Sequence, residues 1–324
     1  MVSFPISTLS TPKIRSLLRL AAVIVFAVIY WTATASAWAA PPKQATFESP
    51  EAAAGALVAA LKANDERRLA ALFGPEGGKL TSSGDPTADR AERARFVTAF
   101  EEAHKIEMQG DAKAVLSVGK DDWPLPVPIV KRGETWRFDA KKGQEEVVNR
   151  RIGKNELSTI QVLLAIVDAQ REYSSEDRNS DGRLEYAQRF RSRPSKTDGL
   201  YWPASQGQPE SPLGPLAATA SREGYKAEAG KRTPYHGYYF KILTGQGKDA
   251  PGGAYSYLAQ GRMIGGFAVV AWPAKWGSSG IMTFVTNQDG VVYEKNLGPD
   301  TATIAGKMRL FDPDSSWTKV EGPV

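Results

Sequence analysis

Residues 155–173 read NELSTIQVLLAIVDAQREY, and this stretch decides how the second half of the chain folds. Its apolar residues recur at helical spacing and are Leu157, Ile160, Val162, Leu163, Leu164, Ile166 and Val167. An apolar arc this broad predicts a long helix packed deeply against other structure. We expect Asn155 to cap this helix, because Gly153 interrupts the charged, helix-like residues 141–151 before it.

Strand-like segments follow this helix and predict the sheet that covers it. They are residues 235–244, 255–258, 263–271, 281–286 and 291–295. A long helix followed by an antiparallel meander resembles the globular part of type IV pilins and pseudopilins. The membrane-inserting N-terminal helix of a pilin is missing from the corresponding position.

The first half of the chain predicts helices followed by an antiparallel sheet. Ser49 and Asn64-Asp65 are expected caps of two helices, and a third helix is expected after Pro86. Residues 112–118, 127–131 and 135–138 alternate as strands. The runs SPEAAAGALVAALKANDERRLAALFGPEG and VPIVKRGETWRFD resemble nuclear transport factor 2-like folds, which implies a helical cone over a curved sheet. The sequence thus predicts an α+β protein of two modules.

The N-terminus is typical of a secretory signal peptide. Lys13, Arg15 and Arg19 precede an apolar run over 20–31, and small residues over 33–40 offer cleavage after Ala37 or Ala39. The apolar run is shorter than the ~20 residues that span a bilayer, so we favour cleavage over a retained membrane anchor. We predict a periplasmic or secreted protein with no membrane attachment after cleavage. The predicted organisation is signal 1–39, linker 40–48, N-terminal domain 49–145 and C-terminal domain 146–324.

Composition excludes several classes of function. The chain has no cysteine, so cysteine nucleophiles and cysteine-ligated zinc are excluded. The formal charge of +5 falls to about +2 without residues 1–39, and no basic stripe of the kind that follows a phosphate backbone is present. We therefore expect no nucleic-acid partner.

Many specific runs between residues 45 and 320 are similar to an exported bacterial family, the domain of unknown function 2950 family. They include DDWPLPVPIVKR, NRRIGKNEL, DGRLEYAQRFRS, PYHGYYFKILT, GGFAVVAWPAKWG and GVVYEKNLGPDT. The resemblance implies membership of that family and brings no activity with it.

One loop has the spacing of a calcium site. Residues 177–182 read DRNSDG, which matches the first half of an EF-hand loop. We expect oxygen ligands from five residues, namely Asp177, Asn179, Asp181, the Arg183 carbonyl and Glu185. Leu184 is expected to anchor the loop to the core, and Gln188 replaces the bidentate Glu of position twelve, which predicts weak binding of Ca²⁺. The alternative is a solvated turn.

Other polar and aromatic groups have two interpretations each. His104 and His236 are the only histidines. We expect packing and a backbone hydrogen bond for His236, with a catalytic role as the alternative, and contact with the C-terminal dipole of its helix for His104. The basic run Arg189, Arg191, Arg193 and Lys196 predicts a solvated face or a site for an anionic envelope ligand. Aromatic residues of the second half, which include Tyr201, Trp202, Tyr238, Tyr239, Trp272 and Trp276, predict sheet packing or a groove that stacks on sugars or on a partner.

These observations favour an exported, non-enzymatic envelope protein that binds or scaffolds an unknown ligand or protein. We assign no catalytic residue and no residue that binds an organic cofactor. Two alternatives remain. One is an envelope hydrolase that uses carboxylates such as Asp121-Asp122 or Glu145-Glu146, although adjacent residues seldom converge on one point. The other is a pilus- or secretion-associated subunit.

Overall fold

The computed structural model describes residues 43–178, 181–204, 209–226 and 231–321, and in them the fold is α+β, as the sequence predicts. The helices are α2 (Pro50–Lys62), α3 (Glu66–Phe73), η1 (Pro75–Gly77), α4 (Gly78–Thr81), α5 (Pro86–Glu102), α6 (Ala140–Ser174), α7 (Gly214–Arg222) and α8 (Thr301–Lys307). The strands of the first half are β1 (His104–Met108), β2 (Lys113–Val118), β3 (Trp123–Pro124), β4 (Ile129–Arg132) and β5 (Thr135–Phe138). Those of the second half are β6 (Tyr238–Leu243), β7 (Gly245–Gln246), β8 (Tyr255–Ser256), β9 (Leu258–Ala259), β10 (Arg262–Met263), β11 (Ala268–Pro273), β12 (Met282–Asn287), β13 (Tyr293–Asn296), β14 (Leu310–Phe311) and β15 (Thr318–Lys319).

The first hydrophobic core lies between α2, α3 and an antiparallel sheet. The sheet has the order β1-β2-β4-β5, with β3 paired to β2. Leu57 and Leu69 from the helices meet Leu116, Ile129 and Phe138 from the strands, and all five are almost fully buried. Burial of such side chains contributes roughly 1.5–3 kcal/mol each, so this core holds the helices on the sheet.

Local capping sets where the first helices begin. The Ser49 hydroxyl accepts a hydrogen bond from the Ala52 amide at 3.1 Å, and the Asp65 carboxylate accepts from the Arg67 and Arg68 amides at 3.0 Å each. Side-chain acceptors at these positions satisfy amides that have no partner inside the helix. The predicted starts of both helices are confirmed.

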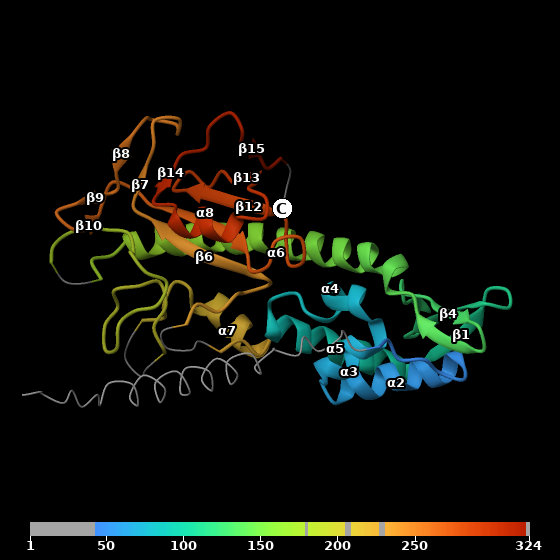
Figure 1. Cartoon of the computed structure of the whole chain (residues 1–324). Helices are drawn as coiled ribbons and strands as arrows, with labels where there is room; N and C mark the ends of the chain where they lie inside the picture. The colour runs from blue at the N-terminus through green and yellow to red at the C-terminus, as the bar shows by residue number, and fades with distance from the viewer. Residues whose placement is uncertain (1–42, 179–180, 205–208, 227–230, 322–324) are drawn as a thin grey trace, which may run out of the picture. The chain divides into compact units, whose positions relative to one another are not determined.

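The second core lies between α6 and a five-stranded antiparallel sheet of order β15-β13-β12-β11-β6 (Figure 1). Leu163 and Ile166 of α6 face Tyr238 of β6 and Phe284 of β12, and each is at most 2 % exposed. Tyr239 is only partly buried, because adjacent residues of a strand point to opposite faces. The predicted packing of this helix on a sheet is confirmed.

The start of the long helix differs from the prediction. A single 35-residue helix, α6, runs from Ala140 to Ser174, which corresponds to about 52 Å at 1.5 Å per residue. Gly153 lies inside this helix and is exposed, and a Cβ at this position would meet no atom within 4 Å. A glycine inside a helix costs about 1 kcal/mol, and because α6 continues through Gly153, packing elsewhere along the helix offsets this cost. Asn155 is not a cap: it is buried and donates to the Ser279 carbonyl at 2.9 Å.

The described residues between 43 and 321 belong to one compact unit, although they contain two cores and two large sheets. Asp85, at the start of α5, ties the halves together: its Oδ2 accepts from the Tyr225 hydroxyl and from the Gly237 amide, both at 2.9 Å. The domain boundary predicted at residues 145/146 falls within α6 and stays a prediction.

The predicted signal peptide and the start of the predicted linker lie outside the described residues. The described end of that linker contacts the first core, because Phe47 forms a backbone bridge with Trp136. No helix in the described part of the chain combines the length and the apolar character that a bilayer span requires. The pilin-like and nuclear transport factor 2-like resemblances stay predictions.

Candidate functional site

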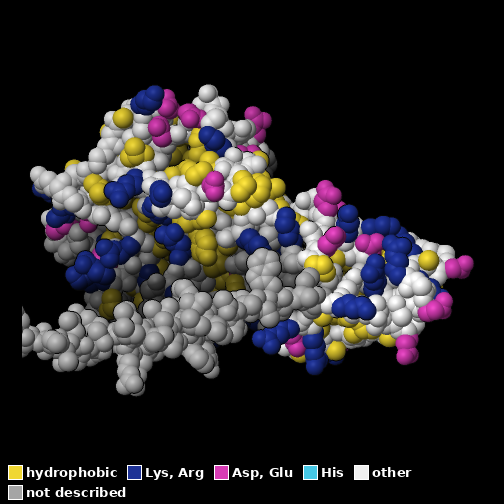
Figure 2. All heavy atoms as spheres, in the orientation of Figure 1, with side chains coloured by type: hydrophobic (Ala, Val, Ile, Leu, Met, Phe, Trp, Pro, Cys, Tyr) yellow, Lys and Arg dark blue, Asp and Glu magenta, His cyan; other side chains and the backbone are white. Residues whose placement is uncertain are grey.

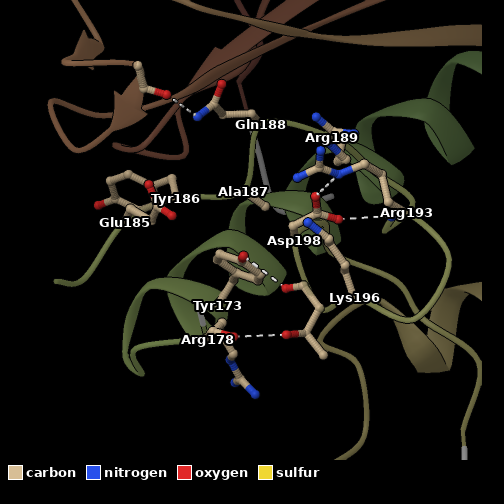
Figure 3. Close-up of a pocket in the computed structure, with 12 residues that line it drawn as sticks. Tyr173, Arg178, Glu185, Tyr186, Ala187, Gln188, Arg189, Arg193, Lys196 and Asp198 are labelled. Atoms are coloured by element: carbon tan, nitrogen blue, oxygen red, sulfur yellow. Dashed lines mark hydrogen bonds and ion pairs between the residues drawn. The ribbon is translucent and has the colours of Figure 1, made fainter. Parts of the chain in front are cut away.

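A pocket of about 540 Å³ lies where the chain leaves α6 (Figure 3). We call it the basic pocket. It is lined by Tyr173, Arg178, Glu185, Tyr186, Ala187, Gln188, Arg189, Arg193, Lys196, Thr197, Asp198 and Gly261. Its volume is within the range of small-molecule sites.

Buried hydrogen bonds hold the walls of the basic pocket in place. The side-chain amide of Gln170, on α6, donates to the Ala187 carbonyl and accepts from the Ala187 amide, both at 2.8 Å. The Tyr173 hydroxyl donates to the Thr197 carbonyl at 3.0 Å, and the Thr197 hydroxyl donates to the Arg178 carbonyl at 2.9 Å. Gln170 and Ala187 are buried, so this segment is fixed to the helix even though it has little regular secondary structure.

Three cationic side chains gather around Asp198. Figure 3 shows the side chains of Arg189, Arg193 and Lys196 in the neighbourhood of Asp198, and Arg193 is ion-paired with it. Partial burial opposes ionisation of Asp198, but hydrogen bonds from Arg193 and the positive charges of Arg189 and Arg193 outweigh this and lower its pKa. Asp198 is therefore an anion at neutral pH, and it positions the Arg193 guanidinium.

Arg178 adds a buried positive charge to the basic pocket. Its side chain is 7 % exposed, pairs with Glu176 at 3.1 Å and lies 5.7 Å from the centre of the Trp202 ring. Its Nε is buried with no hydrogen-bond partner in the described residues. A buried N–H without an acceptor costs free energy that an added acceptor would recover.

The basic pocket has an excess of positive charge. It is lined by four cationic side chains and two carboxylates, and no carboxylate in the described ranges forms an ion pair with Arg189 or Lys196. Figure 2 shows a cluster of Lys and Arg side chains over the loops that follow α6. Tyr173 at the base stays neutral, because burial and then the charges of Glu185 and Asp198 raise its pKa to about 12. The chemistry of this pocket suits an anion.

The predicted calcium loop borders the same region. Asp177 accepts hydrogen bonds from the backbone amides of Asp181 at 3.2 Å and Gly182 at 2.7 Å. Gly182 has φ +78°, the left-handed conformation that a tight loop needs from glycine. Asn179 lies outside the described residues, and Arg183 is exposed.

A cation from the protein itself already contacts this loop. Arg262 is ion-paired with Asp181. Burial raises the pKa of Glu185, and the positive charge of Arg262 opposes this rise. The negative charges of Asp181 and Asp177 raise the pKa further, so all four charged groups lie close enough to influence one another. In the part of the chain that the structure describes, no three His, Asp or Glu side chains are grouped closely enough to hold a metal.

Two further expectations for the loop can be compared with the structure. Leu184 is 57 % exposed and does not anchor the loop, which corrects the prediction: Ala187, three residues later, is the buried anchor. Gln188 donates to the Gly261 carbonyl at 2.8 Å and thereby fixes the loop to the β9–β10 turn.

The two histidines have different surroundings. The His104 Nδ1 lies 2.9 Å from the Phe100 carbonyl at the end of α5. The His236 Nε2 lies 2.8 Å from the Glu223 carboxylate, and its ring stacks on Tyr235 with centroids 4.1 Å apart. The contact with Glu223 was not expected from the sequence.

Comparison with known families agrees with the predicted membership. A family profile described as "Protein of unknown function (DUF2950)" matches residues 44–320. The chain belongs to the DUF2950 family. No curated protein and no solved structure matches it. Because the profile covers both cores, the family assignment applies to the two halves of this DUF2950 protein together.

The sequence indicated some residues of the basic pocket and its surroundings and gave no signal for others. The run that contains Arg189, Arg193 and Lys196 was visible as a charge pattern. Arg262, which pairs with Asp181 of the neighbouring loop and does not line the pocket, was missed because it is 81 residues from Asp181 and carries no local motif. Asp198 was missed because a single acid beside a basic run has no distinctive spacing.

Proposed function

We propose that this DUF2950 protein is an exported, non-enzymatic binding protein of the cell envelope, and that it takes a small anionic ligand in the basic pocket. The observation that carries the proposal is the charge of that pocket, where four cationic side chains face two carboxylates. Arg189 and Lys196 form no ion pair with any carboxylate of the described residues, and the lining has two more cationic side chains than carboxylates. Guanidinium and ammonium groups that converge on one space favour phosphate or carboxylate groups.

The way in which the pocket is held supports binding with little rearrangement. Gln170 fixes one wall through two hydrogen bonds of 2.8 Å to Ala187, and Asp198 holds the Arg193 guanidinium. A site whose polar groups are already positioned loses less conformational entropy when a ligand binds. The neutral Tyr173 hydroxyl at the base adds no competing negative charge.

Isothermal titration of the mature protein with citrate and with inorganic phosphate tests this proposal. We expect heat at low ionic strength and a dissociation constant of about 1 mM or tighter, which corresponds to roughly 4 kcal/mol. The Arg191→Glu variant is the matched control, because Arg191 belongs to the same basic run, is exposed and does not line the pocket. The test variant is Arg189→Glu, which should weaken binding more than the control does. Equal weakening by both variants would mean that general surface charge causes the effect and that the pocket is not the site.

We further propose that the loop from Asp177 to Glu185 binds Ca²⁺ weakly, with oxygens of Asp177, Asn179, Asp181, the Arg183 carbonyl and Glu185 as ligands. The turn at Gly182 and the shared field of Asp177, Asp181 and Glu185 support it. The ion pair between Arg262 and Asp181 would have to open, which agrees with an affinity in the range of about 10⁻⁴–10⁻³ M seen in extracellular modules. Calcium should raise the melting temperature, and Asp181→Ala should remove that increase.

Export is part of the same proposal. Residues 1–39 are proposed to be a cleaved signal peptide, with a periplasmic or secreted mature chain that starts after Ala37 or Ala39. Mass spectrometry of the protein recovered from the periplasm or the medium would measure the N-terminus directly. A mature protein that retains residues 1–39 in the membrane fraction would contradict it.

A further inference from the structure

A second cleft lies along the first half of α6 and is separate from the basic pocket. Its volume is about 620 Å³. Three segments form it: one face of α6, the η1–α4 segment and the turn that leads into β12. On α6 the lining residues fall at spacings of three and four, from Lys141 through Glu145 and Asn149 to Ile152, as expected for one helical face. We call it the Trp276 cleft.

Hydrogen bonds hold the three walls of the Trp276 cleft together. Arg151 of α6 donates to the carbonyls of Lys79 at 2.8 Å and Leu80 at 3.3 Å, which fixes α4 to α6. Ser278 donates to the Ser82 carbonyl at 3.3 Å, which ties the turn to the residue after α4. The cleft therefore has a defined shape before any ligand enters.

The charges of the Trp276 cleft balance. Lys79 and Lys141 face Glu76 and Glu145, so the lining has no net charge. The basic pocket, in contrast, has an excess of positive charge. A lining without net charge gives neither an anion nor a cation an advantage over a neutral ligand. Four charged groups around a cavity nevertheless offer strong hydrogen-bond donors and acceptors.

Two amides add hydrogen-bonding groups of both kinds. Gln144 and Asn149 line the cleft from the same face of α6, and each side-chain amide both donates and accepts. The Gln144 Oε1 is buried with no hydrogen-bond partner in the residues that the structure describes. The accessible donors and acceptors of this lining suit a ligand rich in hydroxyl groups.

An aromatic ring completes the cleft. Trp276 is half-buried, and its Nε1 donates to the Asn296 side chain at 3.0 Å, so the orientation of its indole ring is fixed. Gly277, the next residue, has φ +68°, which produces the sharp turn. Val148, Ile152 and Ile281 also line the cleft, so its walls are both apolar and polar. A held aromatic ring in such a cleft provides apolar surface for a ligand with both apolar and polar faces.

We infer that the Trp276 cleft binds a neutral oligosaccharide. A sugar ring presents C–H groups on its face, which pack on the indole, and hydroxyl groups around its edge, which meet the amides, lysines and carboxylates. The absence of net charge in the lining disfavours a polyanion, and the polar rim disfavours a purely apolar ligand. This inference does not depend on the anion site, because the two cavities share no lining residue.

The test is a titration of the mature protein with neutral tetrasaccharides of N-acetylglucosamine and of glucose, with tetragalacturonate as the anionic comparison. Intrinsic tryptophan fluorescence and calorimetry both report binding. We expect at least one neutral tetrasaccharide to bind with a dissociation constant of about 1 mM or tighter, and tetragalacturonate to bind more weakly.

Three variants locate the binding. Trp276→Ala should weaken it about tenfold or more, since a buried aromatic anchor commonly carries that share of an affinity. Asn149→Ala is an exposed helix substitution that keeps the fold and should weaken binding severalfold, which covers the case in which Trp276→Ala fails to fold. Trp123→Ala is the matched control, because Trp123 is 39 % exposed and lies outside the cleft.

The results decide the inference either way. Loss of binding in the Trp276 and Asn149 variants, with Trp123→Ala unchanged, supports it. If neither neutral tetrasaccharide binds at about 10 mM, the binding free energy is smaller than about 3 kcal/mol, and the inference is overturned. Equal binding by all variants, or tighter binding of tetragalacturonate than of the neutral sugars, overturns it as well.

Discussion

The two cavities along α6 are similar in volume but differ in the net charge of their linings. The basic pocket measures about 540 Å³ and has two more cationic side chains than carboxylates, whereas the Trp276 cleft measures about 620 Å³ and has equal numbers of each. Both receive residues from α6, the first from Tyr173 near its C-terminal end and the second from its N-terminal half. Because the two volumes are similar, the two ligand classes that we propose depend on the charge balance of each lining and not on its size.

The largest expected effect is charge reversal in the basic pocket. The double variant Arg189→Glu, Arg193→Glu should weaken citrate binding by about a hundredfold or more, since replacing attraction by repulsion in a binding site costs several kcal/mol. Calorimetry measures the change. Tetrasaccharide binding in the Trp276 cleft should stay within about twofold, because the cleft shares no lining residue with the basic pocket. Equal loss at both cavities would end the distinction between them.

The second expected effect is a difference in how the ligand affinities of the two cavities respond to ionic strength. Raising the ionic strength from about 0.01 M to 1 M shortens the screening length from about 30 Å to 3 Å. Citrate affinity should therefore fall by about tenfold or more, while affinity for a neutral tetrasaccharide should change by less than about twofold. Parallel calorimetric titrations at several salt concentrations measure both slopes. A salt-independent citrate affinity would contradict the electrostatic account of the basic pocket.

A smaller effect is expected at the loop beside the basic pocket. Arg262→Gln should tighten Ca²⁺ binding by about two- to fivefold, since calcium no longer has to displace the ion pair between Arg262 and Asp181. Arg191→Gln is the control for loss of one positive charge elsewhere on the same surface. Calcium titration followed by melting temperature measures the shift. Weaker calcium binding in Arg262→Gln would mean that this side chain supports the site instead of competing for it.

The smallest expected effect depends on pH. Burial opposes ionisation of Asp198, but Arg193 and Arg189 outweigh it and hold the pKa below the ordinary 3.8. Because the folded pKa is lower than the unfolded one, the stability from Asp198 is complete above about pH 4 and is lost as the pH falls through the folded pKa. Asp198→Asn should lower the melting temperature by about 2–4 °C at pH 7 and by a smaller amount once the pH is below the folded pKa of Asp198.

The control for the pH prediction is a second Asp–Arg pair on the same part of the chain. Asp168 pairs with Arg171 at 3.4 Å and its side chain is 77 % exposed. Asp168→Asn should change the melting temperature by less than about 1 °C at either pH, since exposed pairs contribute little. A pH-independent loss in Asp198→Asn would show that its carboxylate stabilises the loop by shape alone.

Local signals in the sequence predicted local structure well. Ser49 and Asp65 were correctly identified as caps, because the hydrogen bonds of a cap join residues two or three positions apart. The burial of Leu163 and Ile166 was correctly predicted from the apolar arc of α6, because helical periodicity is itself a property of neighbouring residues.

Tertiary context overrode the sequence where a signal was weak or distant. Gly153 predicted a break in α6, but one exposed glycine costs only about 1 kcal/mol, which the packing on either side of it outweighs. Asn155 predicted a cap and instead bonds to Ser279, 124 residues away. Three of the four cationic residues of the basic pocket were visible in the run after the loop, while Arg262, which pairs with Asp181 of that loop, had no signal at all.

The most direct test of the account is one NMR titration of the isotopically labelled mature protein, first with citrate and then with a neutral tetrasaccharide. Two separate sets of backbone amides should shift. Citrate should move residues around Arg189, Arg193 and Asp198, and the sugar should move residues around Asn149 and Trp276. Shifts from both ligands at the same residues, or from neither at these positions, would contradict the claim that charge balance assigns each cavity its ligand.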